Sequence, residues 1–143
     1  MPTHDLPADT WFEQAVQDLR AAEHLLGGGY APHATVLAHL AVEKALKGLF
    51  RERAGTNPPP THNLRHLVKR LRLDLGVDGW GHNLQDALDG LSDVTLLSLY
   101  APDRPFGHPV SDRMDAAREH VAHAQVLVQW MQSKSGSRSG PDG

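Results

Sequence analysis

The apolar and polar residues of this chain alternate with the period of amphipathic helices, and glycine- and proline-rich turns separate the helical stretches. Apolar residues recur at intervals of three and four, the repeat that places them on one face of an α-helix. No segment shows the sustained alternation that predicts a β-strand. The pattern therefore predicts an all-α fold, an up-and-down bundle of four to five helices.

The breaks in this pattern set the expected helix boundaries. We predict helices over residues 10–26, 31–53, 62–73, 83–100 and 113–132. Gly27 and Gly55 should end the first two, and the prolines at 58–60 exclude a helix before the third. The short link between the first two helices predicts an antiparallel pair. Their side-chain chemistry makes these residues the expected N-caps: Asp9 or Thr10, Thr61, and Ser111 or Asp112.

The length of 143 residues fits one domain with one core, which we place at residues 9–132. Residues 1–8 are expected to be flexible. Residues 133–143 are rich in serine and glycine and are expected to be disordered. The proline-rich stretch at 101–109 is not expected to be helical.

The longest helical signal is the stretch 31–53, which Gly48 alone weakens. It is apolar on more than one side, which is typical of a helix at the centre of its domain. One side carries small residues that would let a second helix approach closely: Ala34, Ala38, Ala41, Ala45 and Gly48. Another side carries larger ones: Val36, Leu40, Leu46 and Phe50.

Three polar residues lie among the larger apolar ones at intervals of four: His39, Glu43 and Lys47. Glu43 and Lys47 have the order that favours an i,i+4 ion pair. Buried charge is unfavourable unless it is paired. Two interpretations stay open, a pair that bridges to a neighbouring helix and a cleft that binds a ligand.

Composition excludes several classes of site. The chain has no cysteine, so disulfides and thiolate metal sites are excluded. No apolar run approaches the length of a membrane span, and the N-terminus lacks a secretion signal, so we expect a cytoplasmic protein that does not bind a membrane. His62 and His66 are spaced for two ligands on one helix face, but no acid accompanies them in a metalloenzyme pattern, so we predict neither a metal nor a cofactor.

The net charge is −3, but it is unevenly distributed. The window from residue 44 to residue 72 holds eight basic residues and one acid, a balance of +7 that leaves −10 on the rest of the chain. Such asymmetry either focuses an anionic ligand on one end of the molecule or only keeps two helix faces solvated.

Two motifs resemble a known family. The first is the run AHLAVEKALKGL at residues 38–49, and the second is Thr61-His62-Asn63-Leu64 after the proline-rich gap. Together with a third group of matching residues they resemble a HEPN domain (higher eukaryotes and prokaryotes nucleotide-binding) over about residues 11–131. The third group is Trp11, Ala15, Asp18, Leu19, Ala22 and Tyr30.

The resemblance implies a bundle of four to five helices that is often a homodimer. Many relatives pair with a small nucleotidyltransferase in toxin–antitoxin-like systems. Some are metal-independent ribonucleases that use an Arg and a His four to six residues apart, and others are binding or assembly modules.

This chain departs from the ribonuclease pattern at Tyr100-Ala-Pro-Asp-Arg104-Pro-Phe, where the Tyr that usually follows the Arg is missing. His108 is the nearest histidine, with three residues between. Two pairs on the last predicted helix satisfy the bare spacing: Arg113 with His120, and Arg118 with His123.

We therefore predict a dimeric nucleotide-binding or assembly module, associated with a nucleotidyltransferase partner. The expected ligand-binding residues are Glu43, Lys44, Lys47 and His62. The alternative is a metal-independent ribonuclease in which Arg104 clamps a phosphate and His108 is the general acid or base. Trp80, between two glycines, is either a lid over the core or an exposed ring that stacks a base or meets a partner.

Overall fold

The computed structural model describes residues 5–94 and 110–136. Five helices account for most of these residues, and no strand is found among them: α1 Ala8–Gly27, α2 Ala31–Ala54, α3 Leu64–Leu71, α4 Leu84–Ser92 and α5 Val110–Ser133. The prediction of an all-α helical bundle is confirmed. In the described ranges, no helix combines the length and apolarity needed to cross a membrane.

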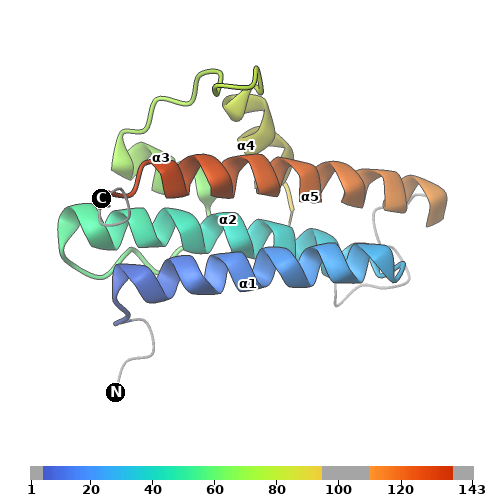
Figure 1. The fold of residues 1–143 in the computed structure, drawn as a ribbon, viewed down its shortest axis with the longest axis horizontal. Coiled ribbons are helices and arrows are strands. Elements are labelled where there is room, and N and C mark those ends of the chain that lie inside the picture. Colours follow the sequence, from blue (N-terminus) through green and yellow to red (C-terminus); the bar gives the residue numbers. More distant parts are fainter. Residues whose placement is uncertain (1–4, 95–109, 137–143) are drawn as a thin grey trace.

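Three long helices, α1, α2 and α5, lie side by side and form the body of the molecule (Figure 1). α1 and α2 are antiparallel, as the short link between them predicts, and α5 runs in the same direction as α2. The two short helices cover the remaining side, with α3 packed on α2 and α4 packed on α5. α2 is therefore the central helix of the domain, in contact with each of the other four.

The small-residue side of α2 packs in the core of the bundle. Its four alanines are fully buried in the core: Ala34, Ala38, Ala41 and Ala45. A Cβ atom at Gly48 would lie 3.1 Å from the ring of Phe12 on α1, which is tighter than ordinary contact. The small residues thus permit the close approach of α1 that the pattern predicted.

Two expected N-caps are wrong. α1 begins at Ala8, and the carbonyl of Pro7 accepts from the backbone N–H groups of Thr10 and Trp11, so neither Asp9 nor Thr10 is the cap. At α5, the helix already begins at Val110, so Ser111 and Asp112 lie within its first turn. In both cases the helix starts earlier than the apolar repeat predicts.

The start of α3 also differs from the prediction. The N-cap is Asn63, whose side chain accepts from the backbone N–H of His66, and not Thr61. Thr61 instead accepts from the backbone N–H of Asn63. His62 therefore lies in the α2–α3 linker, before the helix. α4 is capped in the same way by Asn83 and ends at Ser92, whereas we expected helix to residue 100; residues 95–100 lie outside the described part.

The end of α5 returns to α2. Ser133 is the last helical residue, and Ser135 is buried and donates a 2.7 Å hydrogen bond to Glu52. The backbone N–H of Gly136 donates to the same carboxylate at 2.9 Å. Of the tail expected to be disordered, Ser135 and Gly136 thus contact α2, and residues 137–143 lie outside the described part.

Candidate functional site

A line of buried polar side chains follows α2. Its members lie four residues apart and are each less than a tenth exposed: Thr35, His39, Glu43 and Lys47. Residues at this spacing stack one turn above the next, so they form one polar ridge. At its start the hydroxyl of Thr35 lies 3.2 Å from Nδ1 of His120 on α5. The ridge therefore links the central helix to its neighbours by polar contacts inside an otherwise apolar core.

Glu43 is the centre of this ridge. Its carboxylate accepts a 3.0 Å hydrogen bond from the ammonium of Lys47. It also meets Nδ1 of His62 at 3.0 and 3.1 Å, and Nδ1 of His39 lies 3.9 Å away. The i,i+4 pair predicted from the sequence is formed, and His62 joins it from the α2–α3 linker. The carboxylate thus ties that linker to the central helix.

Lys47 and Lys44 point to different neighbours. Lys47 is buried, and its ammonium lies 5.7 Å from the centroid of the Trp11 ring on α1, so a cation–π contact adds to its ion pair. Lys44 forms a 2.8 Å ion pair with Asp18 of α1. Of the four predicted ligand-binding residues, the structure brings together Glu43, Lys47 and His62 and places Lys44 in a separate contact.

Burial determines the protonation of the neighbouring histidines. Burial lowers the pKa of His39, and the attraction of Glu43 only partly opposes this effect. The pKa of His120 is also lowered, first by burial and then by the charge of nearby His123. Both rings are therefore neutral at pH 7. His62, the other histidine beside Glu43, is not buried, since 67% of its side chain is exposed.

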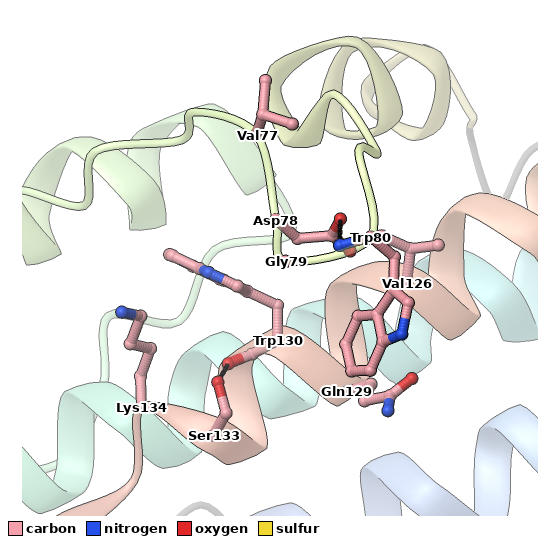
Figure 2. A pocket seen from close by; sticks show the side chains of 9 residues that line it. All are labelled: Val77, Asp78, Gly79, Trp80, Val126, Gln129, Trp130, Ser133 and Lys134. Carbon is pink, nitrogen blue, oxygen red and sulfur yellow. Dashed lines mark hydrogen bonds between the residues drawn. The ribbon is translucent and has the colours of Figure 1, made fainter.

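A pocket of about 390 Å³ lies between the α3–α4 loop and α5 (Figure 2). Trp80 comes from the loop, and Trp130 and Gln129 come from α5. Figure 2 shows the Trp80 indole extending from the loop toward Gln129. The ammonium of Lys134 lies 5.3 Å from the centroid of the Trp130 ring. The lining also includes Val77, Asp78, Gly79, Val126 and Ser133.

The loop that carries Trp80 is held by one carboxylate. Asp78 accepts from the backbone N–H groups of Trp80 at 2.9 Å and His82 at 2.8 Å, and it meets the His82 ring at 2.8 Å. Burial acts to raise the pKa of Asp78, but these hydrogen bonds outweigh it and hold that pKa below its ordinary value. Trp80 is 75% exposed, so it presents an indole to solvent from a fixed turn and is not a lid over the core.

Trp130 is not predicted as a member of this pocket, because in the sequence it is equally consistent with a core or a dimer-interface residue. Only half-burial in the fold separates it from the fully buried positions on the same helix. The glycines beside Trp80 were the one local signal that an aromatic side chain here would be exposed.

Comparison with known proteins places the fold and these motifs in one family. The family model described as HEPN domain matches residues 8–134. The chain belongs to the HEPN family. The match confirms the resemblance found in the sequence, and it spans the five helices from the first residue of α1 to the end of α5.

Solved structures agree with this assignment. TT1696 from Thermus thermophilus is 29% identical with a TM-score of 0.69, over 89% of this chain and 97% of that one. ST0689, an archaeal HEPN homologue, is 22% identical with a TM-score of 0.66, over 90% and 98%. The HEPN domain protein tm0613 from Thermotoga maritima is 21% identical with a TM-score of 0.65, over 90% and 98%, so these last two show the fold alone. A search of curated proteins gave no match.

The Arg–His candidates of this HEPN domain fall in two places. Arg104 and His108 lie outside the described residues. On α5, His120 is occupied by its contact with Thr35, and His123 packs so closely on α4 that a Cβ at Gly90 would lie 2.9 Å from its ring. Where the chain is described, no group of three or more His, Asp or Glu side chains is arranged to hold a metal ion.

Proposed function

We propose that this HEPN domain is a nucleotide-binding and assembly module, and that the nucleotide binds in the pocket between Trp80 and Trp130. The observation that carries the proposal is the combination of two indole rings and one ammonium in a single cavity of ligand size. A nucleotide needs a surface for its flat base and a cation for its phosphate, and both are provided here.

Each lining group has a matching part of the ligand. The exposed face of Trp80 offers stacking for a base, which is worth about 1–3 kcal/mol per base. The exposed amide of Gln129 can donate to and accept from a base edge. Lys134, on the side of Trp130, supplies the positive charge for a phosphate. The Asp78 turn holds Trp80 in place before binding, which reduces the entropy lost on association.

Calorimetric titration with AMP, ATP and adenosine tests this proposal. We expect Trp80→Ala to weaken nucleotide binding about 5- to 150-fold, the range that corresponds to the loss of one stacked base. Lys134→Gln should weaken ATP binding and leave adenosine binding unchanged, because the nucleoside has no phosphate. Tyr30→Ala is the matched control, since Tyr30 is also an exposed aromatic residue, 59% accessible, but belongs to the α1–α2 link.

The result that would contradict the proposal is equal nucleotide affinity of the Trp80→Ala protein and the wild type. Absence of any nucleotide binding by a folded wild-type protein would contradict it as well. Trp80 is exposed, so its removal should leave the melting temperature nearly unchanged and the test interpretable.

The assembly part of the proposal rests on family membership. We propose that the domain forms a homodimer and associates with a nucleotidyltransferase partner. Sedimentation equilibrium at micromolar concentration tests the homodimer, and co-purification with a nucleotidyltransferase encoded beside it tests the partner. A monomer that retains no such partner would contradict this part without affecting the nucleotide site.

A further inference from the structure

The basic window between residues 44 and 72 does not form one continuous patch. Lys44 and Lys47 are paired with acids inside the bundle. Arg65 of α3 lies 3.2 Å from Asp89 of α4 in a third ion pair. These three cations are held in ion pairs, Lys47 within α2 and the other two between helices, so the charge that remains for a ligand lies elsewhere in the window.

Two of the remaining cations line one pocket. Arg53, in the last turn of α2, and Arg70, in the last turn of α3, line the same small pocket of about 160 Å³. Both side chains are exposed, and within the described residues no carboxylate lies at ion-pair distance from either of them. The neighbouring acid, Glu52, is instead bonded to Ser135 and Gly136.

An aromatic ring forms the floor of this pocket. The guanidinium carbon of Arg70 lies 5.5 Å from the centroid of the Phe50 ring, a cation–π contact. Phe50 is buried in the bundle, so it offers a fixed surface that restricts the Arg70 side chain. A guanidinium that is already restricted loses less entropy when it binds an anion.

We propose that Arg53 and Arg70 form a phosphate-binding site. Guanidinium groups bind phosphate oxygens through pairs of N–H donors, and two of them on different helices can contact one phosphate group from two sides. The ligand is a phosphate group. It comes either from a free polyphosphate compound or from the backbone of a single-stranded nucleic acid, and the site is separate from the tryptophan pocket.

The test uses two probes and a double variant. Inorganic pyrophosphate reports on a free phosphate and has no base, so it cannot stack in the tryptophan pocket. A short fluorescein-labelled single-stranded RNA reports on a nucleic acid backbone by anisotropy. The variant R53Q/R70Q removes both guanidiniums. The control R20Q/K69Q makes the same change in net charge at two exposed cations, on α1 and α3, that do not line the pocket.

We expect the double variant to bind at least one probe ten-fold or more weakly, while the control stays within two-fold of the wild type. For RNA, the loss of two phosphate contacts should reduce the slope of log affinity against log salt by about 1.4 between roughly 50 and 200 mM. A loss for both probes assigns the site to free phosphate compounds, and a loss for RNA alone assigns it to a nucleic acid backbone.

Equal affinities of R53Q/R70Q and R20Q/K69Q would overturn the proposal, and so would a wild type that binds neither probe. Because Arg70 covers part of Phe50, the melting temperature of each variant is measured first. Arg53→Gln alone keeps the Arg70–Phe50 contact, so this variant provides the test if the double variant unfolds. Neither outcome depends on whether the tryptophan pocket binds nucleotides.

Discussion

The replacement of Glu43 by leucine tests whether the centre of the polar ridge stabilises the fold. The Glu43 side chain is 4% exposed and its partner Lys47 is 9% exposed, with 3.0 Å between the charged atoms. Removal of the carboxylate leaves the Lys47 ammonium buried, and among the described residues the Trp11 ring is then the one group that offsets its charge. His62 is released as well, but it is largely exposed, so water replaces its lost partner.

The expected loss follows from the burial of this pair. Removal of one partner of a buried ion pair costs about 3–5 kcal/mol, a large part of the ~5–15 kcal/mol that stabilises a typical domain. For a chain of this length, the melting temperature should fall by about 10–20 °C. Replacement of both partners, E43L/K47M, removes the buried charges together and should recover most of the loss.

Urea unfolding followed by circular dichroism measures the four free energies of this double-mutant cycle. Glu13→Leu on α1 is the matched control, because Glu13 is an exposed glutamate and its change should stay within about 0.5 kcal/mol. The reasoning is refuted if Glu43→Leu costs less than about 1 kcal/mol, or if the double variant loses the sum of both single losses. Either result would mean that Lys47 reaches solvent or a ligand and is not held as a buried ion.

Three further perturbations test other parts of the fold. Gly48→Ala should lower the free energy of unfolding by about 1–3 kcal/mol, because the new methyl group would press on the Phe12 ring. Urea unfolding measures this change. A rise in the free energy of unfolding by about 1 kcal/mol, the gain from helix propensity alone, would contradict the close contact. The pKa values of His39 and His120 are lowered by burial, so the unfolded chain binds more protons and stability should fall as the pH drops below about 6.5. His120→Gln should reduce the fall in melting temperature between pH 7 and pH 5, and an unchanged fall would show that His120 does not contribute. Asn63→Ala should destabilise the protein by about 1 kcal/mol through loss of the α3 cap, whereas Asn63→Gly should cost only a few tenths; equal losses in thermal unfolding would argue against the cap.

The helices and the close contact of α1 with α2 could be predicted from the sequence alone. The period of apolar residues and the small side chains of α2 are local properties, and nearby packing satisfies them without any information about distant segments. The family could also be predicted from the sequence, since its motifs are runs of adjacent residues. Helix starts were less predictable, because a helix such as α1 can begin without a side-chain cap.

The candidate sites depend on residues that the sequence separates widely. The i,i+4 pair of Glu43 and Lys47 was visible in the spacing, but the arrival of His62 on the same carboxylate follows from the path of the linker. Trp80 and Trp130 line one pocket because the α3–α4 loop lies over α5, and no pattern within either segment encodes that arrangement.

Sequence by itself determined which segments are helical, which face of α2 allows close packing of a neighbouring helix, and the family to which the chain belongs. Tertiary structure decided which charges are neutralised and which are left for a ligand. The physical reason is the range of each effect. Helix periodicity acts between residues three or four apart, whereas an ion pair or a pocket requires groups from different helices to lie within a few ångströms, and that distance is set only when the whole core packs.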